Sequence, residues 1–292
     1  MKFEGIMPAL VTPLNKDETI NTKVLKELIE YQLAHGADGF YVGGATGEGL
    51  ALRTEERMIL AEESVKAVNG RKPCIFQVAA TNFHDAIALA KYAEKVGADA
   101  ISATPPLFFG YSEQNVYDYY KVLADAVHIP LMIYYNMNAG FTISANFAAK
   151  MFEVDNITAI KWTSPNYYEM IKLKDMTNGE MNIINGPDEM LLMGLNAGAD
   201  GGIGTTYNVQ LENIKAIYDS FKSGNIAEAQ RMQTLADRII NVIIKYRAIP
   251  ATKALLEEMG FAVGDPTFPM NRYSDEEKKQ IAAEAIAAGL KI

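Results

Sequence analysis

The chain has 292 residues, of which 49% are hydrophobic, and its net charge is −9. A folded chain of this length hides roughly three quarters of the surface that it exposes when unfolded, so a large core needs no disulfide or metal to support it. No run of Lys or Arg exceeds two residues. The composition therefore excludes a basic surface for nucleic acid phosphates.

The N-terminal residues MKFEGIMPALVTP include an acid and a proline within a short apolar run. We therefore expect no signal peptide, and no segment approaches the roughly 18 apolar residues that a membrane span needs. The single cysteine, Cys74, lies in the apolar segment CIFQVAA, where a buried side chain is expected. A lone cysteine fits a reducing compartment, so we predict a cytoplasmic protein.

Short apolar runs alternate with longer amphipathic ones through the first 220 residues. In 22–34, for example, apolar residues recur at spacings of three and four, as on one face of a helix. The tripeptide Gly-Ala-Asp recurs where helical patterns end, and glycine there suits a left-handed residue that closes a helix. The predicted strands are 6–11, 39–44, 74–80, 100–105, 131–136, 157–162, 182–186 and 201–206.

Eight strand and helix units predict a (β/α)8 TIM barrel over residues 1–222, with a doubly wound open sheet as the alternative. The strand patterns cease after that point. The segments 225–258 and 274–290 have helical patterns, and Pro250 is expected to open one helix. We therefore expect a C-terminal helical extension over residues 223–292.

In such a barrel, the chemistry lies where the strands end. The sixth predicted strand, within ITAIKWTSP (157–165), carries Lys161. Side chains alternate along a strand, so Lys161 shares the inward face with Ala159 and Thr163, and Trp162 points outward. A dry inward face disfavours the charged ammonium and leaves an amine that can attack a carbonyl. The alternative is a lysine that reaches solvent or pairs with a carboxylate.

Other candidate residues follow other predicted strands. The second strand ends in GGATGEG (43–49), where Thr46 can bind an anion, although a plain glycine turn explains the glycines equally well. The fifth strand ends at Tyr135, whose phenol can relay a proton or simply pack. Asp188 and Glu189 follow the seventh strand, where they can bind sugar hydroxyls or act as favourable charges at a helix N-terminus.

The histidines do not gather at this edge of the barrel. His35 and His128 precede the second and fifth predicted strands, which places them at the opposite end. A metal-dependent aldolase needs histidines near the site. We therefore expect no metal, and no cofactor-binding motif is present.

Taken together in order, five motifs resemble those of the N-acetylneuraminate lyase and dihydrodipicolinate synthase family of class I aldolases. Members of this family are (β/α)8 barrels with a helical C-terminal extension. The resemblance covers essentially the whole chain. The motifs are Gly43 to Glu48, Tyr135-Asn136, Lys161 to Ser164, Gly186 to Glu189 and Gly204 to Asn208.

The resemblance implies that Lys161 forms a Schiff base with the keto carbon of a pyruvate-type substrate, so that no separate cofactor is needed. It also implies that Tyr135 passes protons at the substrate carbonyl. Lys161 and Tyr135 are therefore the implied catalytic residues. The implied substrate-binding residues are Ala45, Thr46, Thr163, Gly186, Asp188, Glu189 and Thr205.

Two features indicate the substrate class. The arginine that follows Tyr-Asn in the synthase branch is absent, because 137–144 has no basic residue before Lys150. The Gly-x-Asp-Glu motif of the lyase branch is present at 186–189. We therefore predict a carbon-carbon lyase that cleaves N-acetylneuraminate to pyruvate and N-acetylmannosamine. The alternatives are a synthase-type condensation, cleavage or dehydration of a 2-keto-3-deoxy sugar acid, and a non-catalytic keto acid sensor.

Two hydroxyls that are common in the family are missing. Ala45 stands in place of Ser or Thr, and Phe109 in place of a tyrosine that reaches in from a neighbouring subunit. Tyr111 or water can substitute for the loop tyrosine. The resemblance further implies a homotetramer or homodimer, with a small 2-keto acid as the binding partner and neither nucleic acid nor membrane.

Overall fold

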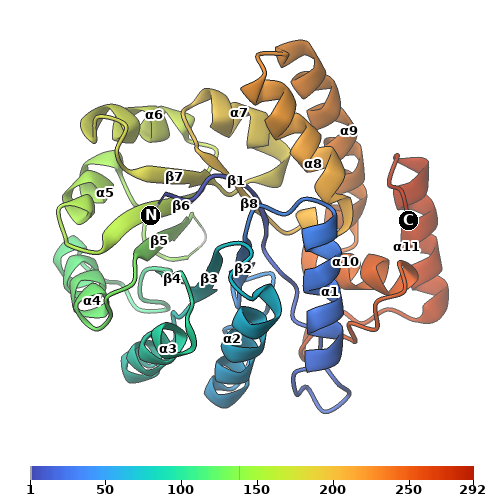
Figure 1. Cartoon of the computed structure of the whole chain (residues 1–292), viewed down its shortest axis with the longest axis horizontal. Helices are drawn as coiled ribbons and strands as arrows, with labels where there is room; N and C mark the ends of the chain where they lie inside the picture. Colours follow the sequence, from blue (N-terminus) through green and yellow to red (C-terminus); the bar gives the residue numbers. More distant parts are fainter. Residues whose placement is uncertain (1, 138) are drawn as a thin grey trace.

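The structure is a computed structural model that describes residues 2–137 and 139–292. Strands and helices alternate, and the helices surround a central barrel (Figure 1). The strands are β1 (Gly5–Pro8), β2 (Phe40–Val42), β3 (Cys74–Gln77), β4 (Ala100–Ala103), β5 (Leu131–Asn136), β6 (Ile157–Thr163), β7 (Asn182–Asn185) and β8 (Gly201–Gly204).

Helices follow these strands in turn, and the short 3₁₀ helix η1 (Asp188–Met190) precedes α7. The barrel helices are α1 (Thr22–Ala34), α2 (Thr54–Val68), α3 (Phe83–Val96), α4 (Glu113–Asp125), α5 (Ala145–Phe152), α6 (Tyr167–Met176), α7 (Leu191–Asn196) and α8 (Tyr207–Lys222). The last helices are α9 (Ile226–Lys245), α10 (Ala248–Glu258) and α11 (Asp275–Ala287).

The eight strands are parallel and the sheet is closed. Its order is β1-β8-β7-β6-β5-β4-β3-β2, and β1 meets β2 through a parallel bridge between Ala9 and Tyr41. The Leu10 N–H donates to the Tyr41 carbonyl at 2.9 Å. Closure rules out the open doubly wound sheet and confirms the predicted TIM barrel with a helical extension.

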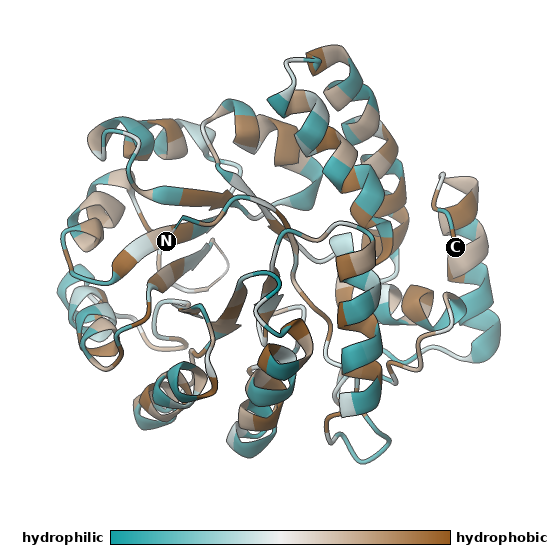
Figure 2. Cartoon of the chain, in the orientation of Figure 1, coloured by the Kyte–Doolittle hydropathy of each residue, from teal (hydrophilic) through white to brown (hydrophobic). Residues whose placement is uncertain are grey.

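Apolar side chains fill both sides of the sheet, and many of the hydrophobic residues of the surrounding helices lie on the sides that face the barrel (Figure 2). The outer layer packs between strands and helices and contains Ile160 and Trp162. The inner layer is a separate buried cluster that includes Ala159, so β6 alternates as predicted. The inner cluster consists of Phe3, Met7, Ala9, Tyr41, Ile75, Ala100, Met132, Tyr134, Ala159, Ile184 and Ile203.

The repeated Gly-Ala-Asp tripeptide performs the same structural role at 36–38, 97–99 and 198–200. Each glycine has a φ between +90° and +98°, the left-handed conformation that was expected after a helix. Each aspartate then accepts a backbone N–H of the neighbouring strand, at Ile6, Cys74 and Ile183, over 2.8 to 3.0 Å. The repeat therefore ties each helix end to the bottom of the barrel.

The extension packs beside α8 and α1 at one side of the barrel (Figure 1). The predicted segment 225–258 forms two helices, because the chain bends at Arg247, whose φ is +65°. Pro250 lies in the first turn of α10, where its missing N–H leaves no helical bond unmade. The domain boundary at residue 222 remains a prediction, and α8 ends at Lys222.

Candidate active site

Lys161 lies inside the barrel at the carboxyl end of β6. Its side chain is buried, with a relative exposure of 5%. Its Nζ lies 4.3 Å from the ring centre of Tyr134 and 4.6 Å from that of Tyr41. Tyr134 is also the residue paired with Lys161 across β5 and β6. The nitrogen is thus held between two aromatic rings at the centre of the barrel.

Tyr135, the implied catalytic tyrosine, belongs to the outer layer of the barrel, and its catalytic role stays a prediction. It pairs with Trp162 in register, and the two rings pack at 4.9 Å in the outer layer. A hydrogen bond joins Tyr135 to Ser164, and burial raises the pKa of its phenol. Neighbouring residues on a strand face opposite sides, so the inward tyrosine is Tyr134.

Tyr41, on β2, was missed by the sequence analysis. Its O–H donates to Ser102 Oγ over 3.0 Å, and burial raises its pKa well above the usual value. Its ring meets that of Tyr134 edge to face, with centroids 5.9 Å apart. The only sequence signal was its position inside a predicted strand, which does not reveal the face.

The loop 43–49 turns tightly at the end of β2. The Gly49 N–H donates to the Gly44 carbonyl over 3.1 Å, and a Cβ on Gly49 would lie 1.9 Å from the Gly43 carbonyl oxygen. Glycine is therefore required there by close approach of the backbone. Ala45 is exposed at the rim. The Thr46 hydroxyl shares a hydrogen bond of 2.7 Å with that of Thr205, so the loops that follow β2 and β8 meet here.

Five of the predicted site residues line one cavity of about 310 Å³: Thr163, Gly186, Asp188, Glu189 and Thr205. A Cβ on Gly186 would lie 2.0 Å from Thr163 Oγ1, so only glycine permits this contact between neighbouring strands. The Thr163 hydroxyl is buried and has no hydrogen-bond partner within residues 2–137 and 139–292.

Asp188 and Glu189 differ in their surroundings. Asp188 is buried and its Oδ2 accepts the Thr206 N–H and hydroxyl, both over 2.7 Å. Burial raises the pKa of Asp188 to about 6, although the Thr206 hydrogen bonds act in the opposite direction. Glu189 is exposed in the same cavity. The pair therefore offers one carboxylate with restricted geometry and one that is free to reorient.

The C-terminal extension also lines this cavity, which the sequence did not predict. Ile240 and Ile244 of α9 and Ala248 of α10 form an apolar wall. Ile244 remains 55% exposed, so its side chain is accessible from the cavity. The site is thus built from both the barrel and the extension.

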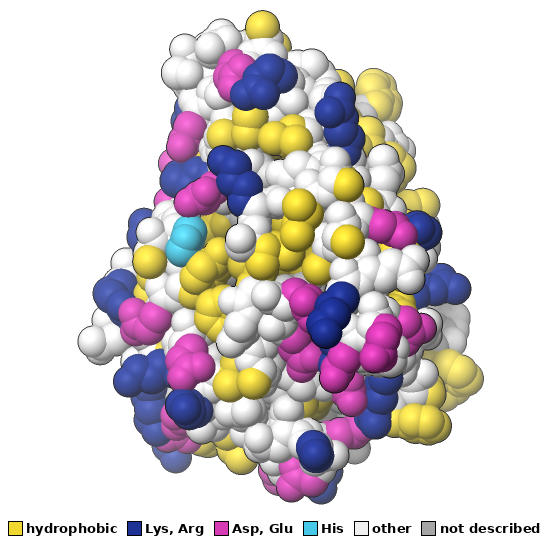
Figure 3. All heavy atoms as spheres, turned by 90° about the vertical axis from the view of Figure 1, so that its right-hand side faces the viewer, with side chains coloured by type: hydrophobic (Ala, Val, Ile, Leu, Met, Phe, Trp, Pro, Cys, Tyr) yellow, Lys and Arg dark blue, Asp and Glu magenta, His cyan; other side chains and the backbone are white. Residues whose placement is uncertain are grey.

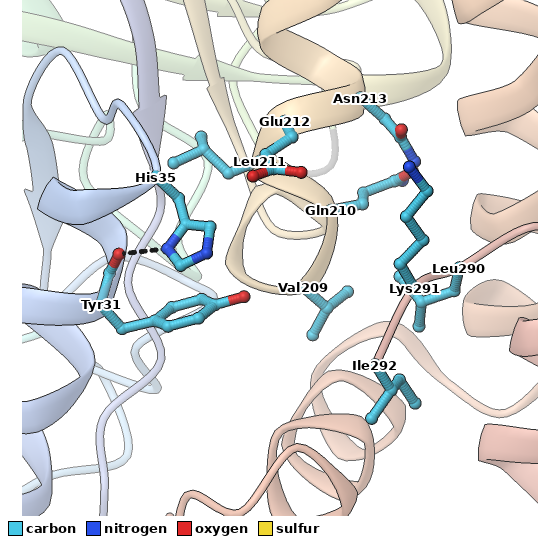
Figure 4. Close-up of a pocket in the computed structure, with 10 residues that line it drawn as sticks. All are labelled: Tyr31, His35, Val209, Gln210, Leu211, Glu212, Asn213, Leu290, Lys291 and Ile292. Carbon is cyan, nitrogen blue, oxygen red and sulfur yellow. Dashed lines mark hydrogen bonds between the residues drawn. The ribbon is translucent and has the colours of Figure 1, made fainter.

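A second cavity, of about 230 Å³, lies between α1, α8 and the residues after α11 (Figure 4). Tyr31 and His35 line it from one side, and the His35 Nδ1 bonds the Tyr31 carbonyl over 2.8 Å. Residues 209–213 and 290–292 line the rest. This cavity contains none of the predicted catalytic or substrate-binding residues, whereas five of them line the cavity beside Lys161, which is therefore the candidate site.

Within the described part of the chain, His, Cys, Asp and Glu side chains form no group of three or more that is suited to holding a metal. Cys74 is a buried free thiol, as expected, and burial raises its pKa to about 12. None of the described helices combines the length and the apolar character needed to span a bilayer.

Comparisons with known proteins agree with this fold and site. Residues 2–288 match the Dihydrodipicolinate synthetase family. The chain is 36% identical to N-acetylneuraminate lyase of Rhizobium meliloti (strain 1021) over 290 residues, covering 98% of this chain and 95% of the relative. Proteus mirabilis N-acetylneuraminate lyase superimposes with a TM-score of 0.95 at 28% identity, with both chains fully covered.

A Clostridium difficile structure determined in complex with mannosamine superimposes with a TM-score of 0.92 at 30% identity, covering 99% of this chain and 98% of that one. The closed barrel, the buried lysine and the helical extension define a lysine-centred (β/α)8 barrel of the aldolase type. The chain belongs to the Dihydrodipicolinate synthetase family, which confirms the family resemblance seen in the sequence.

Proposed function

We propose that this protein is a carbon-carbon lyase that cleaves N-acetylneuraminate to pyruvate and N-acetylmannosamine through a Schiff base on Lys161. The observation that carries the proposal is the position of Lys161, buried between two tyrosine rings at the carboxyl end of β6. The relatives named N-acetylneuraminate lyase support the choice of substrate.

In the proposed reaction, the Lys161 amine adds to the keto carbon C2 of the open-chain sugar acid and water leaves, which gives a protonated imine. This cation accepts the electron pair of the C3–C4 bond as that bond breaks. The C4 hydroxyl loses its proton and becomes the aldehyde of N-acetylmannosamine. The enamine that remains takes a proton at C3, and water then hydrolyses the imine to free pyruvate.

Tyr134, rather than Tyr135, is the proposed proton carrier. Its ring is the one closest to Lys161 Nζ, at 4.3 Å, so its phenol lies on the same side of the sheet as the reacting carbon. A general acid or base must lie within hydrogen-bond reach of the proton that it transfers. The ring of Tyr135 packs instead against Trp162 in the outer layer.

The proposed substrate contacts lie on either side of the lysine. The backbone at Ala45 and the hydroxyl of Thr46 bind the keto acid carboxylate, and Thr163 lies beside the imine. Across the cavity, Gly186 leaves room for the sugar tail, which Asp188 and Glu189 bind through its hydroxyls and which Thr205 approaches from β8.

A direct test is to trap the Schiff base. The protein is incubated with pyruvate and borohydride, and the modified peptide is mapped by mass spectrometry. We expect the added mass on Lys161. Modification elsewhere, or none, would contradict the proposed chemistry, and modification of a Lys161→Ala variant would do the same.

The alternative function is another pyruvate-dependent reaction of the same family. The absence of a basic residue between Asn136 and Lys150 favours cleavage over the synthase condensation, which requires a second carboxylate to be bound. A substrate panel with coupled pyruvate detection separates the two. If N-acetylneuraminate turns over no faster than simple 2-keto-3-deoxy sugar acids, the alternative is preferred.

We further propose a homotetramer or homodimer in the cytoplasm. Phe108 and Phe109 are 91% and 68% exposed in the loop after β4, and their rings pack against each other at 5.1 Å. Such an exposed aromatic pair suits burial against a second copy of the chain. Analytical ultracentrifugation tests this, and a monomer at micromolar concentration would contradict it.

A further inference from the structure

A buried ion pair joins the loop 43–49 to the C-terminal extension. Glu48 lies in the loop and Lys253 lies in α10, and Lys253 Nζ is 2.7 Å from Glu48 Oε1. Their side chains are 0% and 2% exposed. The other carboxylate oxygen, Glu48 Oε2, accepts the Thr267 N–H over 2.6 Å. One carboxylate thus bonds two separate parts of the extension.

Glu48 also determines the shape of the loop through its backbone. Its φ is +57°, a left-handed conformation that is uncommon for a residue with a side chain. Its N–H donates to the Ala45 carbonyl over 3.0 Å, and its carbonyl accepts the Ala51 N–H over 2.8 Å. A shift of Glu48 therefore shifts Ala45 and the adjacent Thr46.

Lys253 is held from the side of the extension. Its Nζ donates to the Asp265 carbonyl over 3.1 Å, and burial lowers its pKa while Glu48 counteracts this effect. Two buried charges of this kind stabilise little as a pair, but removal of one leaves the other without compensation. A contribution to folding stability therefore does not explain why this buried pair is present.

We infer that Glu48 and Lys253 are positioning residues, through which the C-terminal extension holds the loop 43–49 in the conformation that binds the keto acid carboxylate. Neither residue lines the substrate cavity, so each acts through Ala45 and Thr46. This inference rests on the proposed function, because it assigns the loop to the carboxylate of a pyruvate-type substrate.

The test compares Lys253→Met and Glu48→Gln with the parent protein in borohydride trapping over a range of pyruvate concentrations. We expect the pyruvate concentration for half-maximal trapping to rise by about tenfold or more, as for a displaced binding group. Trapping at saturating pyruvate should remain, because Lys161 is untouched. Circular dichroism establishes that each variant is folded at the assay temperature.

Lys278→Met is the matched control. It removes an ion pair with Glu257 that lies in the same extension and joins α10 to α11, without contact to the loop 43–49. We expect the pyruvate concentration for half-maximal trapping of this variant to equal that of the parent. An increase as large as that of Lys253→Met would mean that any weakening of the extension has this effect, and would overturn the inference.

The double variant Glu48→Gln with Lys253→Met leaves no buried charge unpaired, so it is expected to fold even if a single variant does not. We expect it to regain stability while its pyruvate half-saturation stays high. A normal half-saturation in the folded double variant would assign the pair a structural role only. If the parent itself is not trapped at Lys161, the proposed function fails and the inference with it; if the parent is trapped and the variants match it, only the inference fails.

Discussion

At the scale of single residues, the surroundings of Lys161 determine which groups can move protons. Tyr134 and Tyr41 enclose the Lys161 nitrogen, and Tyr41 already donates its O–H to Ser102. Ala45 supplies no hydroxyl to this region. Tyr134 is therefore the residue that we propose for the proton transfers, without the family's usual hydroxyl at position 45.

Substitution of Tyr134 by Phe should lower kcat for N-acetylneuraminate cleavage by about 10²-fold or more, the usual effect of losing a general acid or base. The same change at Tyr135 is the control, because that phenol lies in the outer layer beside Trp162. It should leave kcat within about threefold of the parent. Coupled detection of pyruvate measures both. A larger loss at Tyr135 would reverse the assignment.

Asp188 gives a prediction about pH. Its pKa in the folded protein is about 6, above the ordinary value of 3.8. The folded state therefore binds the proton more tightly than the unfolded chain, and the free energy of unfolding falls as pH rises from about 4 to about 6. A shift of about two pKa units corresponds to about 3 kcal/mol.

Asp188→Asn keeps an oxygen that can accept from Thr206 and has no proton to lose. The stability difference between parent and variant should therefore change by about 3 kcal/mol between about pH 4 and about pH 7, in favour of the variant at the higher pH. Urea unfolding measures it. Parallel stability curves over this range would show that Asp188 does not titrate as described.

At the scale of strands and helices, the sequence contained enough to predict the barrel. Eight apolar runs, three repeated Gly-Ala-Asp junctions and the helical patterns after residue 222 correspond to observed elements. Alternation along β6 places Lys161 with the small residues Ala159 and Thr163 and opposite Trp162, which predicts the inner face for the lysine. The fold and the position of the lysine could therefore be derived from local patterns.

The strand β5 lacked such a marker. Residues 131–135 are all buried, since the barrel interior and the helix layer are both dry. Alternation between polar and apolar residues therefore gives no sign of which face is inside. The register also shifts between Leu131 and Met132. For these reasons the sequence does not reveal which of the adjacent Tyr134 and Tyr135 faces inward. The part of the cavity wall that the C-terminal extension supplies also cannot be predicted, because it depends on packing between residues far apart in the sequence.

At the scale of the whole molecule, the surface charge does not attract the proposed substrate. The protein has a net charge of −9, and N-acetylneuraminate is itself an anion. On the face that carries the extension, acidic and basic side chains are interspersed around a hydrophobic centre (Figure 3). A mixed surface provides little steering, so binding must come from contacts within the cavity. The side chains that α9 contributes to the cavity wall should then contribute to the affinity for N-acetylneuraminate.

Ile244→Glu tests this contribution of the extension. Ile244 lines the cavity with Glu189, so a second carboxylate there would repel Glu189 and the anionic substrate. We expect KM for N-acetylneuraminate to rise about fivefold, corresponding to about 1 kcal/mol of repulsion near a surface. Folding stability should change little, because the side chain is 55% exposed. Steady-state kinetics with coupled pyruvate detection measures KM.

Ile226→Glu is the control for this variant. It places the same charge on the same helix at a residue that is 46% exposed and outside the cavity, so KM should stay at the parent value. Half-saturation by pyruvate alone should also be unchanged in Ile244→Glu, because the proposed site of the keto acid carboxylate is the loop 43–49, on the other side of Lys161. If both glutamate variants raised KM equally, net charge would be responsible, and α9 would have no specific contact with the sugar tail.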